Sequence, residues 1–253
     1  MIDEIFKRNE LFWGEGNQQL LAQKKVAVFG LGGVGGFCVE ALARAGVGNL
    51  TIVDFDTVSA TNINRQIIAL NSTVGQKKTA LFEKRLKDIN PNLQIKVIDD
   101  FYNDQQMVLD LKSDKYDYVA DAIDTMRSKI HLLETCYNNE IPVISSMGAG
   151  NRMDPTKLYI SDLKDIENKN APFVSNVIYQ LKKLGITEGI AFVSSREKPF
   201  VQEKITENEK IKTSSGLDIE FNKIIPASTP FVASVAGIYM ASYIVQSFIG
   251  DYK

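Results

Sequence analysis

The feature that most constrains this chain is a glycine-rich turn within residues 26–66. A short apolar run precedes the turn, and Gly30, Gly32 and Gly35 follow with the spacing G-x-G-x-x-G. A helical pattern comes next and leads to a second apolar run that ends in Asp54. This order of strand, glycine turn, helix and strand is the fingerprint of a nucleotide-binding βαβ unit.

The three glycines have different physical tasks in such a unit. Gly30 allows the tight turn, Gly32 lets backbone N–H groups approach a phosphate, and Gly35 lets the helix pack close to the sheet. The positive amino end of the helix dipole faces the same phosphate. Asp54, 24 residues after Gly30, is placed for a ribose hydroxyl. Up to this point an NAD-linked dehydrogenase fits as well.

A polar loop after Asp54 weakens the dehydrogenase interpretation. Asp56, Asn62, Arg65 and Gln66 lie in this loop, which has neither Gly nor Pro between residues 54 and 66. Ligands of open α/β sheets bind outside the carboxyl ends of the strands, where this loop lies. Arginine is the natural planar partner of phosphate oxygens. The nicotinamide half of a dinucleotide needs no such cationic group, so the loop favours a nucleotide rich in phosphate.

Two lysines open the next predicted helix. Lys77 and Lys78 stand in its first turn, where their charge opposes the helix dipole. We therefore predict that at least one of them meets a phosphate. Two solvated lysines would fit this stretch equally well.

A later strand, predicted at 116–120, ends in the sequence DAID. Asp121 and Asp124 thus lie on the ligand side of the sheet, where carboxylates suit Mg²⁺ held together with phosphates. Asp124 is also placed to cap the following helix. That helix carries the only histidine, His131, to which we assign no role.

The remaining apolar runs continue the alternation of strands and helices. This alternation predicts an α/β fold, a Rossmann-like, mostly parallel sheet flanked by helices. Predicted strands lie at 26–29, 50–53, 95–98, 116–120 and 143–146, with helices at about 33–45, 75–91, 105–111 and 126–139.

The last third of the chain decorates this sheet. A small-residue turn at 147–150 is predicted to leave room for a bound base or an acyl group. An extended edge at 158–161, a short helix at 177–184, a strand at 190–194 and a mobile loop or edge hairpin at 196–216 follow. We expect one domain over 1–253, with an N-terminal helical arm at 1–25, a variable substrate-side region at 162–225 and a C-terminal helix at 230–250.

Composition excludes several classes of protein. The net charge of −2 gives no overall basic field. Cys38 and Cys136 form neither a disulfide framework nor a C-x-x-C zinc site, and no signal peptide is apparent, so we expect a cytoplasmic protein. Residues 231–249 are uncharged and close to membrane-spanning length. Their serines, glycine and glutamine favour a buried terminal helix in a soluble dimer, without stable membrane insertion.

Taken together, these motifs resemble those of the ubiquitin-activating-enzyme-like, ATP-dependent adenylating superfamily, which includes the molybdopterin- and thiamine-biosynthesis adenylyltransferases. The resemblance covers about 1–160 well and the rest loosely. The residues that carry it are the glycine turn at 30–36, Asp54, Asp56, the N-x-x-R-Q sequence of Asn62, Arg65 and Gln66, then Lys78 and Asp124.

The resemblance implies a role for each of these residues. The glycine turn with Gly33 would hold the phosphates of ATP, and Asp54 would bind its ribose. Asp124 would hold Mg²⁺ near the bond being made. Arg8 would reach into the ATP site of a neighbouring subunit, which implies a homodimer. The triphosphate would be bound by Asn62, Arg65 and Lys78, and Asp56 and Gln66 would complete the nucleotide site.

Within the superfamily the chain looks most like the tRNA threonylcarbamoyladenosine dehydratases. The similar stretches include ELFWGEG, EALARAGVGNLTIVDFDTVS and PVISSMGAGNRMDPTKLYISDL. Members of that family use ATP to activate a carboxylate on a modified adenosine beside the anticodon, which then cyclises with loss of water.

The alternative is an adenylyltransferase that activates the C-terminus of a ubiquitin-like sulfur-carrier protein. Such relatives often carry paired zinc cysteines and a loop cysteine, whereas this chain has no cysteine after Cys136. The sequence leaves open a sulfur-transfer partner and the surface on which a tRNA would dock.

Overall fold

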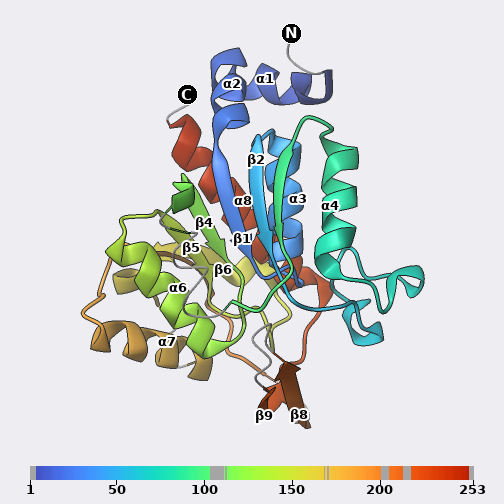
Figure 1. Ribbon diagram of the computed structural model, residues 1–253. Helices are drawn as coiled ribbons and strands as arrows, with labels where there is room; N and C mark the ends of the chain where they lie inside the picture. The colour runs from blue at the N-terminus through green and yellow to red at the C-terminus, as the bar shows by residue number, and fades with distance from the viewer. Residues whose placement is uncertain are drawn as a thin grey trace.

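A computed structural model gives the fold of this chain (Figure 1). It describes residues 4–102, 111, 113–167, 169, 171–200, 205–212 and 218–250, with the backbone alone at 205–212 and 218–225. The helix expected at 105–111 falls almost entirely outside the described residues.

Seven strands form one sheet in the order β3-β2-β1-β4-β5-β7-β6. All neighbours in it are parallel except β6, which runs antiparallel to β7 at the edge. The α/β prediction is therefore confirmed. The strands are β1 (Lys25–Phe29), β2 (Asn49–Val53), β3 (Gln94–Ile98), β4 (Tyr118–Asp121), β5 (Val143–Ser146), β6 (Leu158–Asp162) and β7 (Ala191–Ser195).

Helices cover both faces of this sheet (Figure 1). On one face lie α3 (Gly35–Ala45), α4 (Lys78–Ile89) and α8 (Pro230–Ile249), and on the other lie α6 (Met126–Asn138) and α7 (Pro172–Lys183). Short 3-10 turns are η1 (Glu4–Phe6), η2 (Ala60–Asn62), η3 (Asn71–Thr73), η4 (Pro155–Lys157) and η5 (Leu163–Asp165).

The central strand shows why its sequence is apolar without interruption. Val26 and Val28 of β1 pack into the core beneath α3 and α8, whereas Ala27 and Phe29 pack into the core beneath α6 and α7. Successive side chains of a strand point to opposite faces. A parallel strand with helices on both faces therefore needs apolar residues at every position.

The C-terminal helix α8 packs lengthwise along α3. Gly237 lies at the contact, where an added Cβ would overlap the carbonyl oxygen of Val34. Among the described residues, α8 is the one helix long and apolar enough to cross a membrane, and half of its apolar window is buried inside this chain. Length and composition alone are weak evidence for a span, since the core helix of a globular protein shows the same features.

Different parts of the chain pack at the amino ends and lie beyond the carboxyl ends of the strands. The N-terminal arm consists of α1 (Lys7–Trp13) and α2 (Glu15–Gln23), which break at Gly14, and it packs at the amino ends of the strands. Gly48 N there donates to Leu21 O at 3.1 Å. The hairpin of β8 (Ile205–Lys212) and β9 (Asp218–Ile225) lies beyond the carboxyl ends (Figure 1).

In the last third, the sequence located elements better than their ends. The short helix expected at 177–184 is α7, which begins earlier, at Pro172. Proline suits the first turn of a helix because its missing N–H has no helical partner there. For 196–216 we expected a mobile loop or an edge hairpin. The structure has a hairpin that forms a separate two-stranded sheet, with β8 inside that range and β9 after it.

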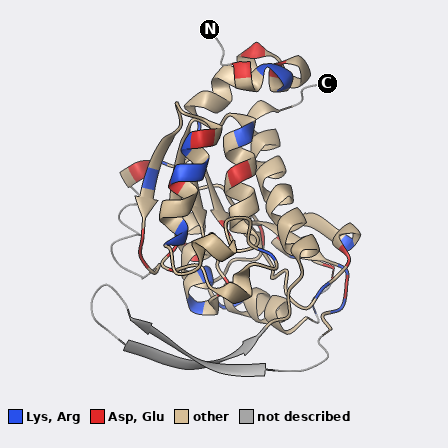
Figure 2. Cartoon of the chain, turned by 90° about the vertical axis from the view of Figure 1, so that its right-hand side faces the viewer, with Lys and Arg blue, Asp and Glu red and all other residues tan. Residues whose placement is uncertain are grey.

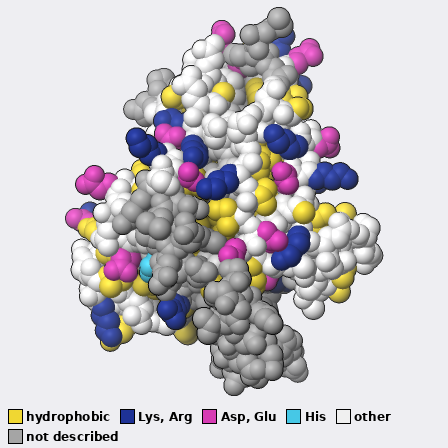
Figure 3. All heavy atoms as spheres, viewed as in Figure 1, with side chains coloured by type: hydrophobic (Ala, Val, Ile, Leu, Met, Phe, Trp, Pro, Cys, Tyr) yellow, Lys and Arg dark blue, Asp and Glu magenta, His cyan; other side chains and the backbone are white. Residues whose placement is uncertain are grey.

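Charged residues of both signs are interspersed over the described part of the molecule. Figure 2 shows Lys and Arg scattered among Asp and Glu over the face in view, and the face seen in Figure 3 has the same mixture. This distribution agrees with the net charge of −2. Ligand recognition therefore depends on local groups rather than on a broad field of one sign.

Candidate functional site

A cavity of about 600 Å³ opens at the carboxyl ends of β1, β2, β3 and β4. The chain leaves β1 toward β2 on one side and leaves β4 toward β5 on the other. This reversal of strand order is the point at which open α/β sheets bind their ligands. Most residues proposed from the sequence line the cavity: Gly30, Gly32, Gly33, Asp54, Asp56, Asn62, Arg65, Gln66, Lys78 and Asp124.

The glycine turn forms the floor of this cavity. Gly30 has a φ of +84°, and a Cβ there would stand 2.8 Å from the carbonyl oxygen of Ala122. Gly35 does not line the cavity. It packs against the turn so closely that a Cβ on it would overlap the carbonyl oxygen of Gly30. Its task is the close packing of α3 on the turn, whereas Gly32 and Gly33 face the open space.

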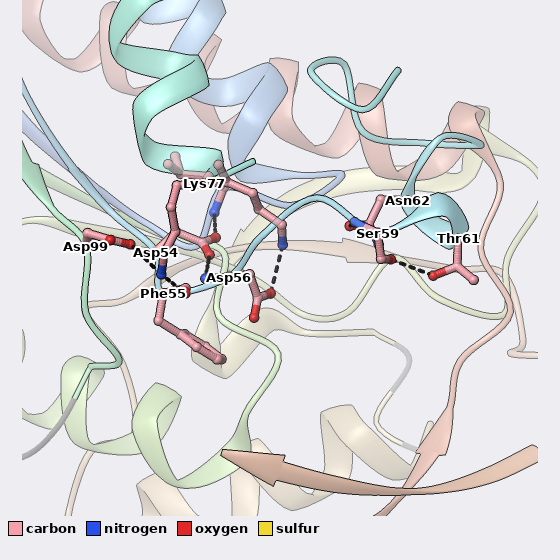
Figure 4. Close-up of polar contacts among 10 residues, drawn as sticks. Asp54, Phe55, Asp56, Ser59, Thr61, Asn62, Lys77 and Asp99 are labelled. Carbon is pink, nitrogen blue, oxygen red and sulfur yellow. Dashed lines mark hydrogen bonds and ion pairs between the residues drawn. The ribbon is translucent and has the colours of Figure 1, made fainter. Parts of the chain in front are cut away.

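Asp54 joins the glycine turn to the polar loop. Its Oδ2 accepts from Leu31 N at 2.6 Å and its Oδ1 accepts from Asp56 N at 2.8 Å (Figure 4). Burial raises the pKa of the Asp54 carboxyl, although Lys78 opposes this effect. The side chain thus fixes two segments of the cavity wall besides facing the cavity.

The two neighbouring lysines have separate environments. Lys78 is 5% exposed at its side chain and its Nζ lies 2.8 Å from Oδ2 of Asp56, whose side chain is 45% exposed in the cavity. Lys77 points away, with its Nζ 2.9 Å from the carbonyl oxygen of Phe55 and 3.2 Å from Oδ1 of Asp99 (Figure 4). Lys78 is therefore the lysine that lines the cavity, and Lys77 is partnered at the surface.

The loop that carries Arg65 is held by its own side chains. Arg65 Nη1 donates to Thr61 O and to Asn64 Oδ1, each at 2.9 Å. Burial lowers the pKa of Arg65, and the charge of Asp124 acts in the opposite direction. Asn62 Oδ1 accepts from Ser59 N at 3.1 Å, which closes the loop.

Gln66 is a buried polar side chain in the cavity wall. Its Oε1 is enclosed, with no hydrogen-bond partner among the described residues. A buried oxygen without a partner costs about 1–3 kcal/mol of stability. Its position in the cavity wall indicates that a molecule in the cavity would supply the missing hydrogen bond.

The sequence suggested that the two aspartates of the DAID sequence act together, but the structure separates them. Asp121 is fully buried and its Oδ2 pairs with Lys129 Nζ at 2.6 Å, while Asp124 lines the cavity just before Thr125, the N-cap of α6. The prediction of two metal-facing carboxylates at this strand end is wrong for Asp121, because its neighbours in the sheet enclose it. Within the described residues, no group of three His, Cys, Asp or Glu side chains could hold a metal.

Aromatic residues that we did not predict form another wall. Phe55 and Phe101 meet edge to face with ring centroids 5.0 Å apart, and both line the cavity with Tyr102. These residues lie within four residues of the ends of β2 and β3, so their position after strand ends was the available signal. Tyr102 also contacts His131, with its hydroxyl 3.0 Å from Nδ1.

The turn at 147–150 is more filled than the sequence suggested. Ala149 and Gly150 line the cavity, but a Cβ on Gly150 would stand 2.6 Å from the ring of Pro226. Arg152, which we did not predict, donates to the carbonyl oxygens of Gly148 and Gly150. Pro226 therefore fills the space beside Gly150, while Ala149 and Gly150 still line the cavity.

Arg8 lies apart from the cavity of its own chain. It is an exposed residue of α1, in the N-terminal arm at the amino edge of the sheet. The next residue, Asn9, donates to the carbonyl oxygen of Arg44 at the end of α3. Within one chain the structure does not bring Arg8 to the other site residues.

A profile of the ThiF family matches residues 6–251, nearly the whole chain. The chain belongs to the ThiF family. The superfamily resemblance found in the sequence is thereby confirmed.

Individual relatives lie close to the chain in sequence and structure. The tRNA threonylcarbamoyladenosine dehydratase of Bacillus subtilis is 41% identical over 251 residues, which cover 97% of this chain and 95% of that protein. The crystal structure of the Escherichia coli tRNA N6-threonylcarbamoyladenosine dehydratase in complex with ATP has a TM-score of 0.83 at 30% identity, and the match covers 98% of this chain and 97% of that one. The E. coli molybdopterin-synthase adenylyltransferase is 36% identical, but over only 54% of this chain and 53% of that protein.

Proposed function

We propose that this member of the ThiF family is an ATP-dependent tRNA threonylcarbamoyladenosine dehydratase. The observation that carries the proposal is the full-length likeness to dehydratases, together with a cavity that collects the predicted phosphate-binding set. The match to a carrier-protein adenylyltransferase covers about half of the chain, so that alternative is supported less well.

The chemistry begins with a carboxylate, which is a poor electrophile because its leaving group would be oxide. Attack of the carboxylate oxygen on the α-phosphorus of ATP would form a mixed anhydride with AMP and release pyrophosphate. The backbone N–H groups of the glycine turn, with Arg65 and Lys78, would stabilise the negative charge on the phosphates as the bond breaks. Asp54 would bind the ribose.

The proposal includes Mg²⁺ bound together with the phosphates. Mg²⁺ keeps several waters and commonly uses one or two carboxylates together with phosphate oxygens, so a site without three protein carboxylates fits it. Asp124 lines the cavity and would be the carboxylate that holds it. When bound, Mg²⁺ would offset phosphate charge.

The second half of the reaction needs a nucleophile, and the protein cysteines are unsuited to supply it. Cys38 and Cys136 are fully buried, and burial raises the pKa of the Cys38 thiol to about 12 and raises that of Cys136 as well. A thiolate is the reactive form of cysteine, so neither residue is prepared for a thioester. A nucleophilic atom of the same modified nucleoside would attack the acyl carbon, and AMP would leave with closure of the ring. Proximity in the bound substrate favours this step.

The protein acts in the cytoplasm as a homodimer in which Arg8 of each chain serves the nucleotide site of the other. The half of α8 that is exposed in one chain, including Phe231 and Ile238, supports such an interface. A sulfur-transfer protein is a further partner in this proposal, which involves no stable insertion into a membrane.

Nucleoside analysis of a tRNA substrate tests the function. The full chain is incubated with ATP, Mg²⁺ and tRNA that carries the open-chain modification, and the digested nucleosides are weighed by mass spectrometry. We expect the modified adenosine to lose the mass of one water, only when ATP is present. An unchanged nucleoside would contradict the proposal. Pyrophosphate exchange driven by a small carrier protein with a diglycine end would instead establish the alternative.

A further inference from the structure

Beneath the cavity lies a polar cluster that is wholly enclosed by the protein. Asp121 at the end of β4, Lys129 in α6 and Ser145 in β5 each have 0% exposure. Lys129 Nζ lies 2.6 Å from Asp121 Oδ2 and 2.9 Å from Ser145 Oγ. Ser145 Oγ donates to the same Asp121 oxygen at 2.6 Å. Each member of this cluster is bonded to both of the others.

Stability alone does not account for such a cluster. The surrounding core is apolar, with Val119, Leu132 and Leu133 packed between the sheet and α6. Taking two charges out of water costs several kcal/mol per ion, and replacing a buried pair by apolar residues is often neutral or stabilising. A buried pair in an apolar core therefore points to a geometric task.

The contacts of the cluster show what that task is. Asp121 Oδ1 accepts from Ile123 N at 3.0 Å, so the aspartate also holds the start of the loop at 122–125. Lys129 N donates to Thr125 O at 3.0 Å, which holds the end of the loop. The Lys129–Asp121 ion pair ties these two ends together, and Ser145 fixes the pair to the next strand. Between the ends, Ile123 and Asp124 line the cavity.

We propose that Asp121, Lys129 and Ser145 are positioning residues that hold the 122–125 loop so that Asp124 faces the phosphates of the bound nucleotide. This inference rests on the proposed function, since Asp124 is there the residue that holds Mg²⁺. The three residues contact no substrate. They act on the reaction through the backbone of the loop.

The test removes both charges at once, so that no unpaired charge remains. In the double variant Asp121→Leu/Lys129→Met, the unfolding midpoint is expected to stay near that of the unsubstituted protein. Amide hydrogen exchange of residues 122–125 should become at least about tenfold faster, because the loop has lost its ties. The Mg²⁺ concentration for half-maximal ATP binding should rise about 10- to 100-fold, the usual effect of removing a group that orients a metal ligand.

A second ion pair supplies the matched control. Glu40 and Arg85 join α3 to α4, with Glu40 Oε2 2.6 Å from Arg85 Nε, and neither residue lines the cavity. The variant Glu40→Leu/Arg85→Met should leave the exchange of residues 122–125 and the Mg²⁺ requirement unchanged. Ser145→Ala, a milder change within the cluster, should shift both quantities in the direction of the double variant but by less.

A purely structural cluster would give another result. If the double variant folds and both the loop exchange and the Mg²⁺ requirement match those of the unsubstituted protein, the inference is overturned. Should the double variant fail to fold, an unchanged Ser145→Ala variant overturns it in the same way. The exchange is measured on the free protein. If the unsubstituted protein does not dehydrate tRNA, the proposed function is rejected. If exchange of residues 122–125 is nevertheless faster in the double variant, the role of the cluster in holding the loop still stands.

Discussion

The carboxyl ends of the strands, here called the carboxyl edge, and their amino ends, the amino edge, differ in how they stabilise charged side chains. At the carboxyl edge, burial raises the pKa of Asp54 and lowers that of Arg65, so both charged forms are disfavoured there. At the amino edge, Lys24 pairs with Asp117 at 2.9 Å, and a hydrogen bond from Lys96 lowers the pKa of Asp114. The amino edge thus stabilises the charges that it carries. The carboxyl edge, besides its Lys78–Asp56 ion pair, holds charges that a ligand could stabilise.

This contrast separates folding from function within one sheet. Proteins tend to break the rules of polar satisfaction at functional sites and to follow them elsewhere. The enclosed Oε1 of Gln66 lies at the carboxyl edge and follows this rule, whereas the enclosed Oε1 of Glu10, in the N-terminal arm, is an exception to it. Substitutions at the carboxyl edge should therefore change activity more than stability, and those at the amino edge should do the reverse.

The largest expected effect comes from Lys78. Lys78→Met removes the cation that faces the cavity, and we expect the rate of pyrophosphate release to fall about 10³-fold, as for the loss of one preorganised charge-stabilising group. The neighbouring variant Lys77→Met loses the hydrogen bond to the carbonyl oxygen of Phe55 and a surface pair with Asp99, which contributes at most about 1 kcal/mol of stability. Steady-state kinetics and urea unfolding of both variants provide the measurement. Equal losses of activity in the two variants would show that the cavity does not distinguish them.

Arg8 is an expected exception to the rule that substitutions at the amino edge change stability more than activity. It belongs to the amino edge, yet the dimer proposal assigns it to the nucleotide site of the partner chain. We expect Arg8→Ala to lower the rate about 10²-fold with little change in the free energy of unfolding.

Subunit mixing shows whether Arg8 acts across an interface. Arg8→Ala and Lys78→Met chains are exchanged in equal amounts, and activity is compared with that of each variant alone. A symmetric dimer would place one intact site in every heterodimer, so about a quarter of the original activity should return. If Arg8 acts within its own chain, no site is intact and no activity returns.

The sequence predicted the carboxyl edge well because its signals are local. The glycine spacing, Asp54 at a strand end and the polar loop through Gln66 lie within one continuous stretch, and the structure brings them to one cavity. Strands with apolar runs, such as β1 and β5, were found for the same reason. The fold class follows from the alternation of these runs with helical patterns.

Features that depend on distant partners could not be predicted in this way. Lys129 reads in the sequence as an ordinary helical lysine, and only the packing of α6 on the sheet buries it against Asp121. The Phe55–Phe101 contact joins the ends of two strands that are adjacent in the sheet but separated by α4 in the chain. Such pairs become visible only once the strand order is known.

The smallest expected effect is a difference in how the two edges respond to pH. The folded pKa of Asp54 is raised above its ordinary value of 3.8 because the carboxyl is buried. At pH values between 3.8 and the folded pKa of Asp54, the folded state binds more protons than the unfolded state. The free energy of unfolding therefore falls as pH rises through this range. The folded pKa of Asp114 is lowered below 3.8, chiefly by its hydrogen bond with Lys96. Its contribution is present above pH 3.8 and is lost as pH falls through the folded pKa.

Two variants separate these opposite slopes. Relative to the unsubstituted protein, Asp54→Asn should become progressively more stable as pH rises above 3.8, and Asp114→Asn should be less stable above 3.8 and should recover below it. Each difference should have the sign of the pKa shift that the substitution removes. Urea unfolding between about pH 3 and 7 gives the free energies, and the double variant should show the sum of the two curves since the sites lie at opposite edges. Slopes of the same sign would mean that both edges stabilise their charges alike, which would remove the electrostatic basis for placing the ligand at the carboxyl edge.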